Sequence, residues 1–402
     1  MKYMHANPKI NDIERLREDT PGSRNKTHLN NAGSSFLSMP TIMAMRDYQD
    51  LENSVGGYEA AQVHSQSLYQ FKQAASHLIG VRSETIAEMN SATHAWQTAF
   101  AAVSFRPGDR IITHAMEYGS NYLAIIAAKS KYDLHVDILK NSTDGIINLD
   151  ELKSMITPRT RLISVTHVAA HTGVVQPVND IGKMARDHGV LYFLDSCQAL
   201  GQFPVNAKTI GCDVMCATGR KFIRGPRGTG FLYASNEFSQ AFPPSIADLQ
   251  SASISSIDGF SFSYGAQRYE TWEKNIANRI GITRAMEYAQ SLGVHVIAVR
   301  LGELVDYIKQ SIQEIPGIET ITQGDQWSSI LAVKLDKPAE LVKDYLAKND
   351  INISIVNPSA APLDTSLEHI PSIIRVSPHY YNTKAEIDYF LHVLSNRRDH
   401  IR

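Results

Sequence analysis

The feature that most constrains the fold is a regular alternation of apolar runs and amphipathic stretches between residues 83 and 235. Short apolar runs of this kind are typical of strands buried in a parallel sheet. They cover residues 85–90, 109–114, 134–139, 161–168, 190–196, 212–218 and 228–235. Helices are predicted between them at residues 92–104, 120–132, 149–155 and 178–188. The alternation predicts an α/β domain with a mostly parallel, doubly wound sheet that carries helices on both faces.

A second pattern begins near residue 276. Helical stretches at 276–292 and 301–315 lead into alternating strand-like and helix-like segments, and the last helix is expected at 384–396. This order predicts a smaller α+β domain at the C-terminal end. The segment 236–267 is rich in Ser, Pro and Gly and breaks the periodicity, so we expect an irregular excursion near the junction of the domains.

Composition narrows the class of partner. The chain has 402 residues, is 43% hydrophobic and 20% charged, and carries a formal net charge of −2. This balance gives no general attraction to nucleic acid or to an anionic membrane, so the expected partner is a small molecule. The polar start of the chain and the lack of a long apolar run predict a cytoplasmic protein without a membrane segment. The odd number of cysteines, Cys197, Cys212 and Cys216, fits reduced thiols better than disulfides.

One lysine, Lys221, directly follows the apolar run 212–218 in the glycine-rich sequence ATGRKFIRGPRGTG. Small neighbours let the backbone approach a bound group, and a lysine there could form a Schiff base with an aldehyde. Taken alone, it could equally be a solvated surface lysine. Asp195 ends another strand-like run, where a carboxylate could keep the pyridine nitrogen of pyridoxal phosphate (PLP) protonated, or could cap a turn. Together the two residues predict PLP held on Lys221.

A phosphate site is predicted where SATH (91–94) joins a strand to a helix. The free N–H groups and positive dipole end of a helix bind anions, which makes Ser91, Ala92 and Thr93 candidate cofactor contacts, although a plain cap at Ser91 is the alternative. Thr218 and Arg220 stand close enough to Lys221 to reach the same phosphate, unless Arg220 is an ordinary surface cation.

Two further residues are candidate cofactor contacts. Gln198 could donate a hydrogen bond to the phenolate oxygen of the cofactor, and Tyr118 in MEYGSN is placed to stack on its ring. A glutamine facing solvent and a core or surface tyrosine are the alternatives.

These motifs, SAT, EY, DxxQ and TGRK in this order and spacing, resemble the class V aminotransferase group of PLP enzymes, which includes cysteine desulfurases and isopenicillin-epimerase-like proteins. The resemblance runs from HLNNAGSS (28–35) to IRVSPHYYNT (374–383). It implies the fold-type-I architecture of PLP-dependent transferases. It divides the chain into an N-terminal arm that joins the small domain and active site (1–35), a large PLP-binding domain (36–280) and a small C-terminal α+β domain (281–402).

The same resemblance implies how a substrate binds. Arg375 is similar to the arginine that clamps the α-carboxylate of the substrate, although a structural salt bridge is the alternative. Asn31, Ala32 and Gly33 would lie near that carboxylate, although an N-terminal turn would use the same residue types. The family forms homodimers with shared active sites, and by similarity Asn275, in RYETWEKNIANR (268–279), would be lent to the cofactor phosphate of the other subunit.

Differences between this sequence and the class V group limit which reaction we expect. Cysteine desulfurases need a mobile cysteine in the C-terminal third, but no cysteine follows Cys216, so desulfurase activity of that type is not expected. Tyr118 stands where many desulfurases have a histidine, and Ala170 and His171 stand where they have an asparagine. His171 could act as an acid or contact the substrate, or could be a core or loop histidine. Several motifs, among them GGYEAA (56–61), resemble the hercynylcysteine sulfoxide lyase branch, which makes ergothioneine.

The resulting hypothesis is a PLP-dependent C–S lyase, which eliminates sulfur from a cysteine conjugate or cysteine sulfoxide to give pyruvate and ammonia. The same cofactor contacts would serve a class V aminotransferase or an amino-acid epimerase, so these stay as alternatives. A non-catalytic regulator would be expected to lose Lys221, Asp195 or Arg375, and all three are present. A nucleotide loop is not expected because GPRGTG leads into a strand, and a metal site is not expected because His167 and His171 lack the HExxH pattern.

Overall fold

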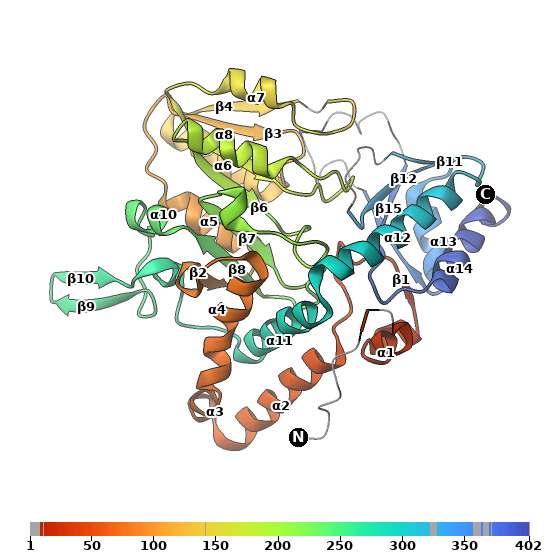
Figure 1. Cartoon of the computed structure of the whole chain (residues 1–402), viewed down its shortest axis with the longest axis horizontal. Helices are drawn as coiled ribbons and strands as arrows, with labels where there is room; N and C mark the ends of the chain where they lie inside the picture. Colours follow the sequence, from red (N-terminus) through yellow and green to blue (C-terminus); the bar gives the residue numbers. More distant parts are fainter. Residues whose placement is uncertain are drawn as a thin grey trace.

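The computed structural model describes residues 9–10, 12–140, 142–321, 328–356, 363–364, 370 and 372–401. Two lobes are evident, a large one around a central sheet and a smaller one built mainly from the C-terminal part of the chain (Figure 1). Within these residues, no helix is both long enough and apolar enough to cross a membrane.

The large lobe is built on a seven-stranded sheet in the order β2-β8-β7-β6-β5-β3-β4. The strand β8 is antiparallel to both of its neighbours, and every other neighbouring pair is parallel. The strands are β2 (Ile86–Met89), β3 (Arg110–His114), β4 (His135–Leu139), β5 (Thr160–Thr166), β6 (Leu191–Asp195), β7 (Val214–Thr218) and β8 (Gly230–Ala234). The predicted mostly parallel α/β sheet is confirmed, and each strand lies within its predicted run to within a residue or two.

Helices cover both faces of this sheet, as predicted (Figure 1). Successive residues of a strand point to opposite faces, so Ile111 and Leu162 pack in one apolar cluster while Ile112 and Ile163 pack in another. The first cluster contains α5 (Ala92–Ala102) and α6 (Gly119–Tyr132). The second contains α4 (Ser65–Ile79), α7 (Leu149–Met155), α8 (Val178–Asp187), α9 (Ala207–Ile210) and part of α11 (Ile276–Leu292).

The N-terminal segment connects the two lobes. It contains α1 (Ile13–Glu18), the short 3-10 helix η1 (Pro21–Arg24) and β1 (Thr27–His28), and β1 pairs in parallel with β13 (Ile351–Asn352) of the small lobe. The chain then enters the large lobe through α2 (Met39–Val55), α3 (Gly57–Val63) and α4, with η2 (Ser83–Thr85) before β2.

The small lobe has an antiparallel sheet in the order β11-β12-β15-β14. Its elements are α12 (Val294–Ile312), β11 (Ile318–Thr320), β12 (Leu331–Leu335), α13 (Ala339–Lys348), β14 (Ser354–Ile355), β15 (Ile373–Val376), α14 (Lys384–Ser395) and α15 (Arg397–His400). The helix α11 packs against α2 and α4 of the large lobe, and Gly293 separates it from α12. The predicted division into domains stays a prediction.

The segment 236–267 differs from the expectation of an irregular excursion near the domain junction. It contains α10 (Asn236–Ala241) and an antiparallel hairpin of β9 (Ala252–Ser256) and β10 (Gly259–Phe262), followed by η3 (Gly265–Tyr269). The hairpin projects from the side of the large lobe that faces away from the small lobe (Figure 1). Alternating apolar residues on either side of Asp258 and Gly259 are a hairpin signal, which the abundance of serine obscured.

Candidate active site

Lys221 lies in a loop that starts where β7 ends, at Thr218. Its side chain is buried, and burial lowers the pKa of its amine, helped by Arg220 and Arg375 and opposed by Cys197 and Asp195. Burial disfavours the charged ammonium, and a neutral amine is the form that can attack an aldehyde. The surface-lysine alternative is therefore ruled out, and the environment suits covalent attachment of a carbonyl group.

The loop after Lys221 is anchored by the buried guanidinium of Arg224. Its Nη1 donates to the hydroxyl of Tyr380 at 2.7 Å, its Nη2 to Thr20 Oγ1 at 2.7 Å, and its Nε to the carbonyl oxygen of Phe36 at 2.8 Å. These partners come from the N-terminal segment and the small lobe, so the lysine loop is fixed to both.

Asp195 ends β6, one strand away from the lysine loop, and lines the same cavity as Lys221. Its Oδ1 accepts a hydrogen bond from the backbone N–H of Cys197 at 2.9 Å, and its Oδ2 accepts one from Asn121 Nδ2 at 3.2 Å. These two donors hold the buried carboxylate in a fixed position at the wall of the cavity. Asp195 can therefore hold a protonated ring nitrogen, as the sequence predicts.

The predicted phosphate cradle lies at the start of α5 and lines the Lys221 cavity, together with Thr218 and Arg220. Ser91 is a true N-cap, since its hydroxyl accepts from the N–H of His94 at 3.1 Å. The N–H groups of Ala92 and Thr93 lie in the first turn, which has no intrahelical acceptor for them. Both alternatives considered for SATH are thus compatible, because Ser91 caps the helix whose N-terminus faces the cavity.

Three more predicted residues line this cavity, namely Tyr118, Gln198 and His171. Tyr118 is the N-terminal cap residue of α6 and keeps about a third of its surface exposed (37%). Gln198 Nε2 donates to the carbonyl oxygen of Ala32 at 3.1 Å and retains a second hydrogen for a ligand. His171 Nε2 lies 2.7 Å from Asp364 Oδ2, so this histidine is paired with a carboxylate.

Arg375 comes from β15 of the small lobe and points toward the large lobe. Its Nη1 donates to the carbonyl oxygen of Ala170 at 2.7 Å, and its Nη2 to Asn30 Oδ1 at 3.2 Å. Its Nε is buried, and among the described residues it has neither a hydrogen-bond partner nor an ion pair with a carboxylate. Burial and the neighbouring Arg220 lower the pKa of the guanidinium to about 10. A cation held between the lobes without a carboxylate fits the predicted carboxylate clamp.

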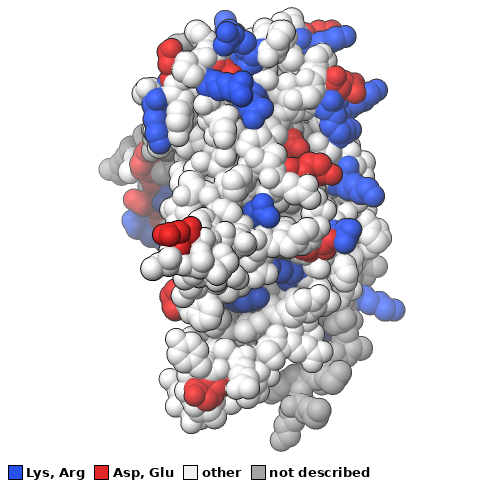
Figure 2. Space-filling model, turned by 90° about the vertical axis from the view of Figure 1, so that its left-hand side faces the viewer, with Lys and Arg blue, Asp and Glu red and all other residues white. Residues whose placement is uncertain are grey.

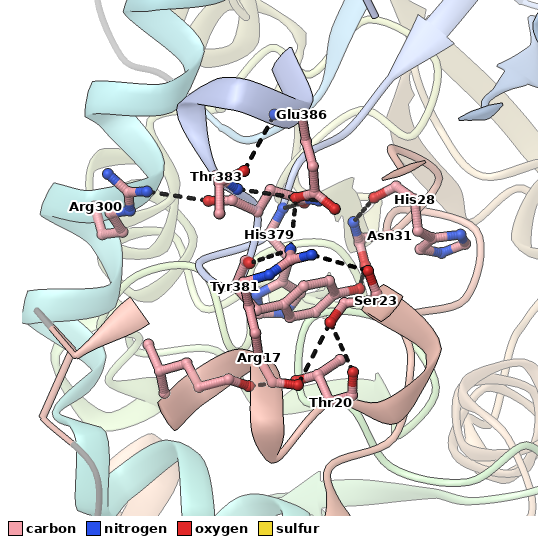
Figure 3. A network of polar contacts seen from close by, with 12 residues as sticks. Arg17, Thr20, Ser23, His28, Asn31, Arg300, His379, Tyr381, Thr383 and Glu386 are labelled. Atoms are coloured by element: carbon pink, nitrogen blue, oxygen red, sulfur yellow. Dashed lines mark hydrogen bonds and ion pairs between the residues drawn. The ribbon is translucent and has the colours of Figure 1, made fainter. Parts of the chain in front are cut away.

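Asn31 belongs to a polar network that ties the N-terminal segment to the small lobe (Figure 3). Its Nδ2 donates to the carbonyl oxygens of His28 at 3.1 Å and Ser377 at 2.8 Å, and its Oδ1 accepts from the hydroxyl of Tyr381. Both Nδ2 hydrogens serve the fold, so this side chain has no donor left for a substrate carboxylate, and its predicted substrate contact stays a prediction. Its neighbour Asn30, which the sequence did not single out, is the residue that contacts Arg375.

Ala32 and Gly33 contribute backbone rather than side-chain contacts. The carbonyl oxygen of Ala32 accepts from Gln198, and that of Gly33 accepts from Arg220 Nη1. They therefore orient two predicted cofactor residues.

Asn275 is separated from the lysine cavity. It caps α11 by accepting a hydrogen bond from the N–H of Asn278 at 2.8 Å, and it lines a different cavity that also includes Asn90 and Gly228. Its predicted role in the other subunit's site stays a prediction.

Glu117 and Asn121 are site residues that the sequence did not reveal. Glu117 is buried and lines the cavity next to Tyr118. One Asn121 amide nitrogen donates both to Glu117 Oε1 at 3.1 Å and to Asp195 Oδ2 at 3.2 Å, so it links the two carboxylates. The spacing of Glu117 and Asn121, four residues apart at the start of a helix, is the signal that could have found the pair.

The donors and acceptors of this cavity suit PLP group by group. Lys221 supplies the amine, Asp195 the partner for the ring nitrogen, and the start of α5 with Thr218 and Arg220 the anion site. Gln198 Oε1 and Arg375 Nε are buried polar atoms without a partner among the described residues, as expected where a ligand completes the site. The fold and this cavity define a PLP enzyme of fold type I.

Comparison with known families also identifies a PLP enzyme. A model of the aminotransferase class-V family matches residues 27–390, and the chain belongs to this family. The predicted family, its PLP cofactor and its enzyme class, a PLP-dependent lyase or aminotransferase, are confirmed. The finer resemblance to hercynylcysteine sulfoxide lyases stays a prediction.

Curated relatives carry the name cysteine desulfurase. A probable cysteine desulfurase of Methanothermobacter thermautotrophicus is 26% identical over 381 residues, covering 93% of this chain and 95% of the relative. A cysteine desulfurase of Cronobacter sakazakii is 30% identical over 285 residues, covering 70% and 69%.

Solved structures with the same fold include two different kinds of enzyme. The cysteine desulfurase CsdA of Escherichia coli superposes with a TM-score of 0.89 at 20% identity, covering 97% of this chain and 99% of that one. The cystine C-S lyase C-DES, solved with its reaction product cysteine persulfide, superposes with a TM-score of 0.84 at 20% identity, covering 94% and 99%. At these identities the likeness establishes the fold.

Proposed function

We propose that the protein is a C–S lyase that acts on an S-substituted cysteine or its sulfoxide. The overall reaction consumes water and yields pyruvate, ammonia and the sulfur-containing side chain. The observation that carries this proposal is the position of the cysteines. Cys197, Cys212 and Cys216 are all buried free thiols in or beside the central sheet, and the sequence holds no others. A desulfurase needs a mobile cysteine to carry sulfur away, so here the sulfur must leave with the substrate's own side chain.

The fold is compatible with such a reaction, since C-DES, which shares it, is a C-S lyase. The finer substrate class, a cysteine sulfoxide of the hercynylcysteine type, rests on the motif resemblance. Transamination and epimerisation would use the same cofactor contacts, and no residue of the cavity favours either.

PLP, when bound, supplies an electron sink that stabilises negative charge at the substrate Cα. The N–H groups of Ala92 and Thr93, with Thr218 and Arg220, would hold the phosphate, and Asp195 would hold the ring nitrogen. Tyr118 would contact the ring and Gln198 would bind its phenolate oxygen. Arg375 would bind the α-carboxylate of the substrate through the guanidinium edge that carries Nε. Lys221, buried and with a lowered pKa, accepts the Cα proton.

We also propose that two copies of the chain form the active unit. In this arrangement Asn275 and its neighbours at the start of α11 border the other subunit's site. The proposal is supported by the position of Asn275, which lines a cavity separate from the one that holds Lys221 of the same chain.

The test measures products and bound cofactor together. The PLP-loaded protein is mixed with S-substituted cysteines and their sulfoxides, hercynylcysteine sulfoxide included, and pyruvate release is followed beside the visible absorbance of the bound cofactor. We expect pyruvate from at least one sulfur compound. In Lys221→Ala, we expect the characteristic absorbance to disappear. The rate of pyruvate formation should fall by about 10³-fold or more.

The matched control is Lys208→Ala, the same substitution at an exposed lysine of α9, which should leave both signals unchanged. A 2-oxo acid that retains the substrate side chain would indicate transamination instead. A change of Cα configuration without pyruvate would indicate an epimerase. Either result would refute the lyase proposal.

A further inference from the structure

We propose that His171, held by Asp364, is the general acid that protonates the departing sulfur atom. This inference rests on the proposed C–S lyase function and adds a catalytic residue to it. None of the cofactor contacts described above delivers a proton to the leaving group, so the reaction needs a further group in the cavity.

The loop that carries His171 is held rigidly. The N–H of Ala169 donates to the carbonyl oxygen of Val174, and the N–H of Gly173 to that of Ala169, both at 2.9 Å, so the histidine lies in a tight turn. Gly173 has a positive φ of 81°, and a Cβ there would lie 2.1 Å from the carbonyl oxygen of Ile330. The turn therefore packs directly against the small lobe, and His171 has a fixed position at the wall of the cavity.

Asp364 fixes the ring and its protonation pattern. The pair is buried, with side chains that are 9% and 0% exposed, and the two atoms Nε2 and Oδ2 are 2.7 Å apart. A carboxylate on one ring nitrogen fixes the orientation and the tautomer of the imidazole, as in hydrolase triads. Nδ1 of His171 has no hydrogen-bond partner among the described residues, so it is the nitrogen left for a substrate. In the protonated state Nδ1–H is the proton to be donated.

Other titratable groups at the cavity fit this step less well. Lys221 takes the Cα proton, and the guanidinium groups of Arg220 and Arg375 hold their protons too tightly to be acids near neutral pH. His114 lies close by, but burial lowers its pKa to about 3, so it is neutral and accepts from the N–H of Thr166 at 3.0 Å. Tyr118 also lines the cavity and carries a hydroxyl group, so it is a rival donor that the test must separate from His171.

The step balances without any further reactant. The Cα–H bond breaks and its proton goes to Lys221. The electron pair moves into a new Cα–Cβ bond, the Cβ–S bond breaks, and its electrons stay on sulfur. The leaving group takes the Nδ1 proton of His171, on sulfur to leave as a thiol, or on the sulfoxide oxygen to leave as a sulfenic acid. Water then hydrolyses the three-carbon fragment to pyruvate and ammonia, and Lys221 and His171 exchange protons with solvent.

The test compares two leaving groups, because a general acid matters only when the departing sulfur is basic. S-ethylcysteine releases a strongly basic thiolate, and S-(4-nitrophenyl)cysteine a weakly basic one. The variant is His171→Gln, whose amide can still hydrogen-bond to Asp364 but cannot donate a proton as an acid. We expect pyruvate formation from S-ethylcysteine to fall by about 10²–10⁴-fold, and that from the nitrophenyl compound by less than about tenfold.

Two controls separate this role from a structural one. His167→Asn removes another buried histidine of the same segment, one that faces Ser196 at 3.3 Å and lies outside the lysine cavity; any slowing should fall equally on both substrates. Asp364→Asn keeps the imidazole and weakens its support, so it should show the same selectivity to a smaller degree. It also tests the proposal if His171→Gln does not fold. Thermal melting and the visible cofactor absorbance verify that each variant is folded and loaded.

The outcomes are distinguishable. If the wild type makes no pyruvate from these two compounds or from any cysteine sulfoxide of the panel, the lyase function itself fails and this inference fails with it. If the wild type makes pyruvate from both but His171→Gln slows both equally, the lyase function stands and His171 only supports the structure. If the leaving-group selectivity appears in Tyr118→Phe and not in His171→Gln, the acid is Tyr118 and the inference is overturned.

Discussion

At the scale of single residues, the buried carboxylate of Glu117 organises the side of the site that faces Asp195. It accepts five hydrogen bonds, which fix the positions of the side chains and backbone that donate them. Through Asn121 it fixes one oxygen of Asp195, and through the backbone N–H of Tyr118 it fixes the start of α6. The donors are Thr113 Oγ1, Ser164 Oγ, Thr166 Oγ1, Asn121 Nδ2 and Tyr118 N, at 2.6–3.2 Å.

Glu117→Gln should therefore weaken PLP binding without unfolding the protein. The amide presents an NH2 group in place of one carboxylate oxygen and lacks the negative charge, so it holds Asn121, and through it Asp195, more weakly. We expect the dissociation constant of PLP to rise by about tenfold or more, equivalent to about 1.4 kcal/mol, measured by absorbance titration of the apo-protein.

The control for this variant is Thr113→Val, which removes one donor to Oε2 and leaves the Oε1 side with Asn121 intact. Its affinity for PLP should change by less than about threefold. Equal effects of the two substitutions would show that Glu117 contributes only general stability.

The sequence predicts the role of a site residue where residue type and position after a strand are enough to indicate it. It does not predict roles that depend on burial. Lys221 and Asp195 each follow a recognisable strand, so the topology brings them together at one sheet edge. Glu117 looks like an ordinary helix-start acid in the sequence, and only the fold reveals that it is buried. The structural partners of Asn31, Ser377 and Tyr381, could not be predicted either, because they lie far away along the chain.

At the scale of elements, the phosphate cradle depends on a close approach of β8 to the start of α5. Gly230 begins β8, and a Cβ there would lie 2.4 Å from the carbonyl oxygen of Ala217 in β7 and 3.0 Å from the carbonyl carbon of Ser91. Both contacts are to backbone, which cannot rotate away. The absence of a side chain thus lets the strand support the cofactor loop and the helix N-terminus at once.

Gly230→Ala should push β8 away from these two segments. We expect a loss of stability of about 1–3 kcal/mol, since an extra methyl group in a packed interior forces the backbone to shift. Weaker phosphate binding should accompany it, measured as the affinity of the apo-protein for PLP.

The matched control is Gly302→Ala in α12, where a Cβ meets no atom within 4 Å. This change should stabilise the protein by about 0.5–1 kcal/mol, because alanine is the better helix former. Thermal and urea unfolding measure both variants. If Gly230→Ala behaves like Gly302→Ala, the packing argument is wrong.

The elements of the large sheet were predictable because strands buried on both faces produce continuous apolar runs between helices. The hairpin of β9 and β10 was not predicted, because its serines and a single glycine turn resemble a loop. Short pairings such as β1 with β13 have only two residues each, and their partners are distant in the chain. Local patterns carry no information about such contacts.

At the scale of the whole molecule, the lysine loop, the N-terminal segment and the small lobe form one connected unit. Arg224 binds Thr20 and Tyr380, and the network around Asn31 and Tyr381 joins the same segments (Figure 3). Arg375 reaches across from the small lobe to the carbonyl oxygen of Ala170. A movement of the small lobe would therefore change the carboxylate clamp and the lysine loop together.

The hairpin of β9 and β10 lies outside this connected unit. It exposes Ile254, Ile257 and Phe260, which are 76%, 99% and 54% exposed, and Ile254 pairs with Phe260 across the two strands. The face of the molecule from which the hairpin projects has broad uncharged areas, with Lys and Arg gathered toward its upper end (Figure 2). An isolated two-stranded hairpin is marginally stable in water, and clustered exposed apolar side chains mark interaction sites.

We therefore expect the hairpin to be covered by a second copy of the chain in the predicted homodimer. Replacing both members of the cross-strand pair, in Ile254→Glu with Phe260→Glu, would place charges in that interface. The dimer dissociation constant should rise by about 100-fold or more, equivalent to about 2.7 kcal/mol, measured by sedimentation over a range of concentrations. If Asn275 completes the partner's phosphate site, the dissociated protein should also bind PLP more weakly.

Val299→Glu is the matched control for this last substitution, because Val299 is 63% exposed on α12 of the small lobe, away from the hairpin. It should leave the sedimentation behaviour and PLP affinity unchanged. A wild-type monomer would refute the dimer and with it the shared site. A dimer that persists in the double variant would instead show that the two copies meet on another face, and would leave the exposed hairpin for a different partner.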